Sequence, residues 1–298
     1  MKKVIGIDVG GTSIGGSIVS ENGDILKTLE LKTSKSGSSY EVINGIKDII
    51  DSLYTKNEIM GIGIGAPGFI DSNKGKVLSV GGNIEGWAGT NLKDEIKNYY
   101  KLPIKIENDA NAACICEAWL GAGKGMSSFI MLTVGTGLGG GIFLKDTGII
   151  RGEHFQAGEL GHALLYPGGI QCTCGQRGCS ERYISGTAIE NHFLSLSGLK
   201  LTGREIFDLY YTDERAKLVI DDFAKNMGYF IISLKNLFDP QAIIIGGGVI
   251  NSRAYWFDNM VKTYNNLVND KASLIIEPAK YLNNAGMIGA AKAVLDIL

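Results

Sequence analysis

The sequence lacks the features by which charged tails, membrane spans and export signals are recognised. No run of five or more like charges occurs in its 298 residues, and 29 Lys and Arg against 31 Asp and Glu leave a net charge of −2. This balance predicts no nucleic-acid partner. No apolar stretch of about 18 residues is present, and no basic segment at the N-terminus leads into an apolar run and a small-residue cleavage site. We therefore expect a cytoplasmic protein that does not associate with a membrane.

Cysteine, proline and histidine are scarce, with five, five and three residues. Three of the cysteines lie within residues 172–179, which disfavours a disulfide framework and suits a reducing compartment. Cys114 and Cys116 lie in an Ala-rich stretch expected to be helical, so we interpret them as packing residues. Glycine, by contrast, occurs 42 times, mostly in clusters expected to form turns. No Gly-x-x-x-x-Gly-Lys-Ser/Thr P-loop is present.

One short segment combines a histidine with most of the cysteines. His162 is followed by Cys172, Cys174 and Cys179, and intervening glycines allow the backbone to turn so that the three sulfurs converge. One imidazole and three thiolates supply the four ligands of a closed tetrahedral site. The pattern predicts a structural Zn²⁺ bound by these four residues. The alternative is a free-thiol loop beside a surface histidine.

The order of the expected elements indicates an α/β protein with an internal repeat. Strands are expected at residues 4–8, 14–19 and 25–31, followed by a helix at 40–53 and a strand at 59–65. The opening then recurs as strand, glycine turn and strand, and residues 9, 10, 15 and 16 are matched by residues 134, 135, 140 and 141 at a constant offset. The repeat predicts two related lobes. Further strands are expected at 104–107, 129–134, 139–144, 242–245 and 273–277, and further helices at 92–100, 110–120, near 187, from 202, at 213–238, 255–267 and 286–298.

The length of the chain also favours two lobes, since single cores stop growing near about 250 to 300 residues. We place a small N-terminal α/β lobe at residues 1–118 plus 286–298. Residues 119–285 then form a large C-terminal lobe that carries the zinc-binding loop. Outside the motifs, we interpret Glu117 and Lys124 as parts of a solvated face.

The first glycine turn places a carboxylate beside exposed backbone amides. Asp8 ends an expected strand and is able to hold Mg²⁺, directly or through water, while Gly10, Gly11 and Thr12 offer amides and a hydroxyl to phosphate oxygens.

Two further turns share this character. Thr133, Gly135, Thr136 and Gly137 repeat the first turn without its carboxylate, as expected of a second phosphate loop. Residues 246–248 form a third turn, in which Gly247 and Gly248 are suited to the flat face and ribose of a nucleotide, although this turn does not match the Gly-x-Gly-x-x-Gly fingerprint. Each turn alone is compatible with a plain hairpin. Two of them on a repeat favour phosphate binding.

Five motifs together resemble the ROK family (repressors, open reading frames and sugar kinases), most closely its bacterial glucokinases. They are Asp8-x-Gly-Gly-Thr12, Glu107-Asn-Asp-Ala-Asn111-Ala-Ala, the glycine-rich residues 132–141, Glu159-x-Gly-His162 and Cys172-x-Cys-Gly-x-x-Gly-Cys179-x-Glu181. The resemblance spans nearly the whole chain. It implies an actin-like or hexokinase-like (RNase H-like) fold of two duplicated α/β lobes around a cleft. It also implies transfer of the γ-phosphoryl group of ATP to a hexose hydroxyl, and assembly as a homodimer or homotetramer.

The resemblance also implies a role for each matched position. Asp109 is expected to be the catalytic base, although a helix N-cap is the alternative for this residue. ATP with Mg²⁺ is expected at the glycine turns. The sugar hydroxyls are expected to bind Gly68, Asn83, Asn108, Asp109, Glu159, His162 and Glu181. For Asn83 and Trp87 the alternatives are a turn residue and a core aromatic.

Other functions remain open at this point. Glucose is the favoured acceptor, but kinases of this family for fructose, allose, N-acetylglucosamine and N-acetylmannosamine have the same motifs. A ROK repressor carries a DNA-binding helix-turn-helix ahead of the first strand, and here residues 1–3 lead straight into that strand. A non-catalytic sugar sensor predicts a lost base or phosphate turn. A different actin-like ATPase does not need the sugar-facing residues of the 159–181 segment.

Overall fold

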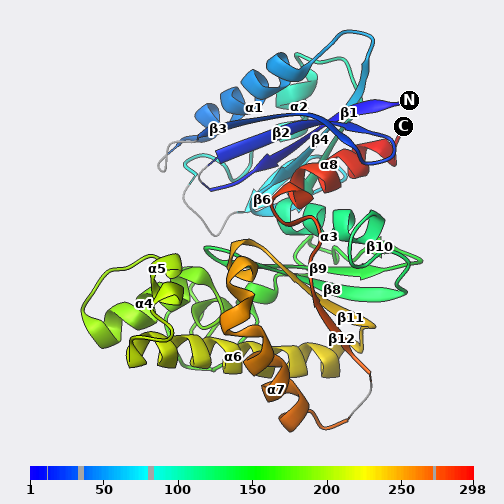
Figure 1. Cartoon of the computed structure of the whole chain (residues 1–298). Helices are drawn as coiled ribbons and strands as arrows, with labels where there is room; N and C mark the ends of the chain where they lie inside the picture. Colours follow the sequence, from blue (N-terminus) through cyan, green and yellow to red (C-terminus); the bar gives the residue numbers. More distant parts are fainter. Residues whose placement is uncertain (12, 33–36, 80–83, 271–272) are drawn as a thin grey trace. The chain divides into compact units, whose positions relative to one another are not determined.

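The computed structural model describes residues 1–11, 13–32, 37–79, 84–270 and 273–298. These residues divide into two compact units (Figure 1). Unit 1 comprises Met1–Gly125, Gly141–Gly158 and Asn283–Leu298, and unit 2 comprises Met126–Gly140 and Glu159–Leu282. No helix in the described part of the chain is long and apolar enough to cross a membrane.

Unit 1 is built on a five-stranded mixed sheet with the order β3-β2-β1-β4-β7. The first three strands form an antiparallel meander, and β4 and β7 continue the sheet in parallel with β1. The five strands are β1 (Lys3–Val9), β2 (Ser13–Ser20), β3 (Ile25–Lys32), β4 (Ile59–Ala66) and β7 (Ile104–Asn108).

The two faces of this sheet are covered by different helices (Figure 1). Along β1, Ile5 and Ile7 belong to the core beneath α1 (Ser39–Leu53), whereas Val4 packs with the helix α8 (Ala285–Leu295). This alternation follows from the two-residue period of a strand. Gly6 points toward α8, and any side chain there would clash with the Met287 carbonyl. The apolar spacing that predicted α1 is therefore confirmed by the face that it buries.

The helix α3 (Asp109–Trp119) packs closely against α8. A Cβ at Gly289 would clash with the backbone of Ala112, so a glycine is needed where the two helices touch. Cys114 and Cys116 on α3 are fully buried, which confirms their interpretation as packing residues.

The interpretation of Glu117 as part of a solvated face is wrong. Its side chain is fully buried, and one carboxylate oxygen accepts a hydrogen bond of 2.7 Å from the amide of Ala122. The chain turns back after α3 and brings that amide to the carboxylate. The hydrogen bond partly compensates for the water that the buried charge loses. Lys124 is exposed, as expected.

Unit 1 also contains a hairpin that the sequence did not suggest, made of β5 (Phe69–Asp71) and β6 (Lys76–Ser79). The short helix α2 (Leu92–Lys97) follows it, three residues shorter than expected at its C-terminal end. Trp87 lies between them with no exposed surface, and its indole N–H donates to the Pro67 carbonyl. The core interpretation of Trp87 is thus confirmed.

Unit 2 is built on the strands β8 (Ser128–Val134), β11 (Ala242–Gly246) and β12 (Ile275–Pro278), which are parallel neighbours. The strand β9 (Leu138–Leu144) begins in unit 2 after the second glycine turn and continues into unit 1, where it pairs with β10 (Gly148–Ile149). The order strand, glycine turn, strand therefore occurs twice in the chain, as the repeat predicted.

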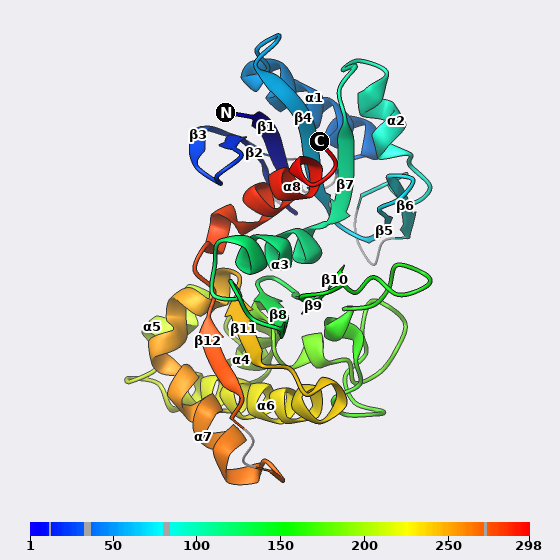
Figure 2. The same cartoon turned by 90° about the vertical axis from the view of Figure 1, so that its right-hand side faces the viewer.

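Several helices pack together in unit 2 (Figure 2). The longest, α6 (Glu214–Phe238), packs against α4 (Gly186–Ser197) and α7 (Phe257–Leu267). The capping box expected at Thr202 and Glu205 is present at the start of α5 (Gly203–Asp208). The segment Gly248–Tyr255 is a 3₁₀ helix, so α7 begins two residues later than expected.

Candidate functional site

In unit 1 the expected catalytic aspartate lies at the first turn of α3. The side chain of Asn108 caps this helix by accepting from the Asn111 amide at 3.0 Å, so the N-cap is Asn108 and not Asp109. Asp109 Oδ1 accepts from the Ala110 amide at 2.8 Å. Asn108 Nδ2 donates to the Gly68 carbonyl at 3.1 Å, which brings Gly68, Asn108 and Asp109 together.

A second carboxylate lies close to Asp109. Asp8, near the end of β1, is partly buried, and the loss of surrounding water together with the charge of Asp109 raises its pKa to about 7. Burial also raises the pKa of Asp109, and hydrogen bonds from the Ala110 and Asp109 amides and from Asn108 oppose this shift. Gly286 on α8 leaves room for the Asp8 carboxylate, since a Cβ there would clash with it. Two neighbouring carboxylates of raised pKa form a site that a divalent cation would stabilise.

The first glycine turn follows Asp8 directly. Gly10 and Gly11 are exposed, and the Gly10 amide donates to the Ser13 carbonyl at 2.9 Å. The Gly11 backbone has open space around it. Thr12, expected at the same turn, and Asn83, expected at the sugar, lie outside the described residues.

In unit 2 the second and third glycine turns meet at a cavity of about 740 Å³. Gly135, Thr136 and Gly248 line it, and the carbonyls of Gly135 and Thr136 accept from the first amides of α4. Gly247 does not line the cavity, but its φ of +83° and its closeness to Val134 require a glycine there. Thr133 lies within β8, paired with Gly246. The cavity is also lined by Thr187, Glu190, Arg204 and Tyr255, which the sequence motifs did not reveal.

The four expected metal ligands converge in unit 2. Cys172 Sγ lies 3.8 Å from His162 Nδ1, and Cys174 Sγ lies 3.6 Å from Cys179 Sγ. All four ligand atoms lie within 4.8 Å of one another. In a tetrahedron with Zn–S bonds of about 2.3 Å and a Zn–N bond of about 2.0 Å, two sulfurs are about 3.8 Å apart and a sulfur and the nitrogen about 3.5 Å apart. The donor set and its spacing therefore fit a bound Zn²⁺.

Two 3₁₀ turns hold the remaining expected sugar ligands next to this cluster. Glu159 precedes the turn Leu160–His162, and Glu181 lies in the turn Ser180–Arg182. Ser180 ties the two turns together, because its hydroxyl donates to the Leu160 carbonyl at 2.6 Å and its amide donates to the Ala163 carbonyl. Glu181 Oε2 also accepts from the Leu138 amide at 3.0 Å, which links it to the end of the second glycine turn.

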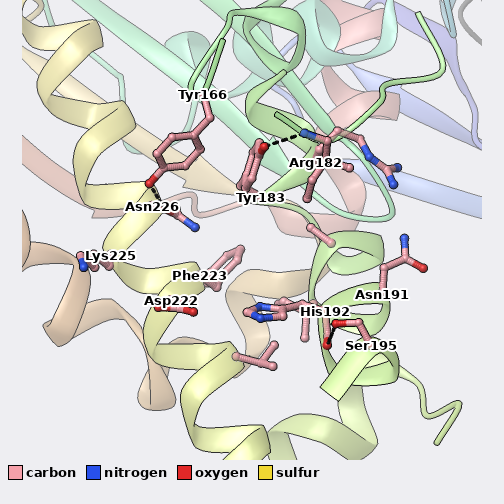
Figure 3. A pocket seen from close by; sticks show the side chains of 14 residues that line it. Tyr166, Arg182, Tyr183, Asn191, His192, Ser195, Asp222, Phe223, Lys225 and Asn226 are labelled. Atoms are coloured by element: carbon pink, nitrogen blue, oxygen red, sulfur yellow. Dashed lines mark hydrogen bonds between the residues drawn. The ribbon is translucent and has the colours of Figure 1, made fainter. Parts of the chain in front are cut away.

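A separate cavity of about 450 Å³ lies between α4, α6 and the segment around Tyr166 (Figure 3). Tyr166 donates to Asn226 Oδ1 at 2.7 Å at one wall, and the ring of His192 projects into the cavity from α4. None of the expected site residues lines it.

Comparisons with known proteins agree with these observations. The sequence model of the ROK family matches residues 4–297, and the chain belongs to the ROK family. A glucokinase of Halalkalibacterium halodurans is 36% identical over 266 residues, which cover 82% of this chain and 80% of the relative. A beta-glucoside kinase of Listeria monocytogenes is 32% identical over 293 residues, covering 97% and 96%.

The same relationship is visible in a solved structure. The crystal structure of a ROK family glucokinase from Streptomyces griseus, in complex with glucose and AMPPNP, is 32% identical with a TM-score of 0.85, over 97% of this chain and 98% of that chain. The expected two-lobed, hexokinase-like α/β fold is thereby confirmed.

Proposed function

We propose that this protein transfers the γ-phosphoryl group of ATP to a hexose hydroxyl, and that glucose, which would yield glucose 6-phosphate, is its preferred acceptor. The observation that carries the proposal is the placement of Asp109 at the first turn of α3, with Gly68 and Asn108 beside it and Asp8 close by. The glucokinase of H. halodurans and the glucose complex of the S. griseus enzyme support the choice of acceptor.

In this proposal Asp109 orients the attacking hydroxyl and accepts its proton. Phosphoryl transfer has a loose transition state in most analyses, so that positioning and charge stabilisation matter more than a strong base. A carboxylate whose pKa is raised by burial is a better proton acceptor than an ordinary aspartate, provided that it is ionised at the working pH. Closure over the substrates would exclude water, which competes as an acceptor.

The substrates would be bound by the two sets of residues expected from the sequence. The hexose set is Gly68, Asn83, Asn108, Asp109, Glu159, His162 and Glu181, and the ATP set is Asp8, Gly10, Gly11, Thr12, Thr133, Gly135, Thr136, Gly137, Gly247 and Gly248. The cavity lined by Gly135, Thr136 and Gly248 has room for the base and ribose of a nucleotide. A pyranose presents a ring of hydroxyls, and a site built to pair each of them rejects sugars that leave its buried groups unpaired.

Two metal ions belong to the proposal. Asp8 would hold Mg²⁺, which neutralises charge on the phosphates of ATP when it is bound. His162, Cys172, Cys174 and Cys179 would hold Zn²⁺, which with four protein ligands has no open position and is therefore structural. His162 faces the sulfurs through Nδ1, so its Nε2 edge is free to meet a sugar hydroxyl.

We further propose the lobes at residues 1–118 plus 286–298 and 119–285, a homodimeric or homotetrameric assembly and a cytoplasmic location. The unbridged cysteines suit a reducing compartment.

The second candidate is a kinase for another sugar acceptor, which the similarity to the L. monocytogenes beta-glucoside kinase favours. A non-catalytic sugar-sensing regulator fits less well, because Asp8, Asp109 and both phosphate turns are present in this chain.

A coupled assay with ATP and a panel of acceptors tests the proposal. The panel contains glucose, mannose, fructose, allose, the N-acetylhexosamines and a β-glucoside, and the readout is sugar-dependent ADP release. The highest kcat/KM is expected for glucose. A higher value for another sugar would select the second candidate, and ATP hydrolysis that needs no sugar would contradict both.

A further inference from the structure

The carboxylate of Glu107 in unit 1 is buried and accepts four hydrogen bonds. Only 1% of its side chain is exposed. Its Oε1 accepts from the Asn108 amide at 3.1 Å and from Asn111 Nδ2 at 3.3 Å, and its Oε2 accepts from Arg151 Nε at 3.0 Å and Nη2 at 2.6 Å. A carboxylate can be buried at this position only because these four donors compensate for the water that it loses.

These hydrogen bonds hold the backbone on both sides of Asp109 in the sequence. Asn108 and Asn111 flank it in the sequence, and both donate to the same oxygen of Glu107. Asn108 also caps the Asn111 amide. The backbone of the turn that carries Asp109 is therefore fixed on both sides by one buried carboxylate, and the orientation of that carboxylate depends on Arg151.

Arg151 comes from a different part of the chain, just after β10, and is 44 residues away from Glu107 in the sequence. Its side chain keeps 30% of its surface exposed and lines a cavity of about 420 Å³ together with Ile115 and Trp119 of α3. The guanidinium therefore reaches the buried carboxylate from a space that small molecules can enter.

We propose that Arg151 is a positioning residue for the phosphoryl transfer, which acts through Glu107 to hold Asp109 in its reactive place. This inference rests on the proposed function of Asp109 as the base. Within the described residues, the hydrogen bonds of Arg151 go to Glu107 and to the Ile149 carbonyl, and not to the proposed sugar residues or nucleotide turns. Loss of Arg151 is expected to slow the chemical step more than it weakens the binding of the sugar, which Asn108 and Asp109 also contact in the proposal, and to leave the binding of ATP nearly unchanged.

A purely stabilising ion pair makes a different prediction. It would lower the unfolding temperature and leave kcat unchanged in the protein that remains folded. Arg215 provides the matched control, because it forms an ion pair of the same 2.6 Å length with Asp213 at the start of α6 and lines none of the proposed site. The variants are therefore R151A, R151K and R215A, assayed well below their unfolding midpoints.

We expect R151A to lower kcat for the wild type's preferred sugar by about tenfold to a hundredfold, since small displacements of a catalytic group have effects of this size. KM for ATP should change less than about twofold, and KM for the sugar should change by a smaller factor than kcat. R215A should retain the wild-type kcat. Guanidinium ion at millimolar concentration should restore part of the activity of R151A, because the deletion opens the Glu107 carboxylate to the adjoining cavity, and should not affect R215A.

R151K keeps the charge but lacks the two-nitrogen geometry, so its kcat should lie between those of the wild type and R151A. Wild-type kcat in R151K or in R151A, or an equal loss in R215A, would overturn the inference. If R151A does not fold, R151K alone still decides it. A wild-type protein that phosphorylates no sugar would instead refute the proposed function, so the two failures are distinguishable.

Discussion

The charge of Asp109, at the start of α3, acts on Asp8, at the end of β1. Burial and this repulsion raise the pKa of Asp8 to about 7, and burial raises the pKa of Asp109 as well. Two buried like charges destabilise the folded protein unless a proton or a cation lies between them. Without a bound cation, the charged forms of the carboxylates proposed for catalysis and for Mg²⁺ therefore lower the stability of the fold. Substitutions of Asp8 and Asp109 and changes of pH should have measurable effects for this reason.

Replacement of Asp109 by asparagine should remove the proton acceptor without changing the shape of the turn. We expect D109N to lower kcat by about 10²–10⁴-fold, the usual contribution of a general base. The fold should survive, because Asn108 and not Asp109 caps the helix. Steady-state kinetics with circular dichroism as the control for folding will check this. Turnover near that of the wild type would end the assignment of Asp109.

The pH dependence of kcat/KM, which reports ionisation of the free enzyme, should show the raised pKa of Asp109. The base works only when ionised, so activity is lost as the pH falls through its pKa, and a raised pKa moves this loss to a higher pH than the usual value of about 3.9. The residual activity of D109N should not show this acidic limb. An acidic limb at the pH of an ordinary aspartate would contradict the raised pKa.

Replacement of Asp8 by asparagine should stabilise the protein while abolishing its activity. The pKa of Asp8 is about 7 in the folded protein and 3.8 in the unfolded chain, so ionisation of Asp8 destabilises the fold. This destabilisation is complete above pH 7 and absent below pH 3.8. The difference between the two pKa values corresponds to at most about 4 kcal/mol, and the partial exposure of Asp8 reduces this value. We therefore expect D8N to raise the free energy of unfolding by about 1–4 kcal/mol at pH 8 and by less at pH 5. Thermal unfolding of metal-free protein at the two pH values measures the difference. A larger gain at pH 5 would have the wrong sign.

Loss of one thiolate should remove the metal. C174S is expected to contain no zinc by elemental analysis and to unfold at a lower temperature, because binding free energy at such a site contributes to folding. C116S is the control, since Cys116 is buried on α3 and is not one of the four clustered ligands, and its replacement should lower stability but leave the zinc content unchanged. Wild-type protein that contains no zinc after purification without chelators would refute the site.

Local patterns were enough to predict much of this molecule. The convergence of His162 with three cysteines followed from spacing, and the cap at Thr202 followed from one pair of residues. Arg204 and Tyr255, by contrast, lie about 50 residues apart and reach the same cavity only through the packing of α5 against the 3₁₀ segment Gly248–Tyr255.

The same limit explains the errors. In the sequence, Glu117 does not differ from other charged residues on a helix. Its burial depends on the turn after α3, which brings the Ala122 amide to its carboxylate, and helical periodicity does not indicate this. The ion pair of Glu107 with Arg151 depends in the same way on two segments that only the tertiary fold brings together.

The close fit of Gly6 in β1 against Met287 in α8 has a consequence for biosynthesis. One face of the sheet that contains β1 is covered by a helix that is synthesised much later. Unit 1 therefore cannot finish folding before α8 has been made, and the α8-facing side of its sheet stays open to chaperones or to other nascent chains until then.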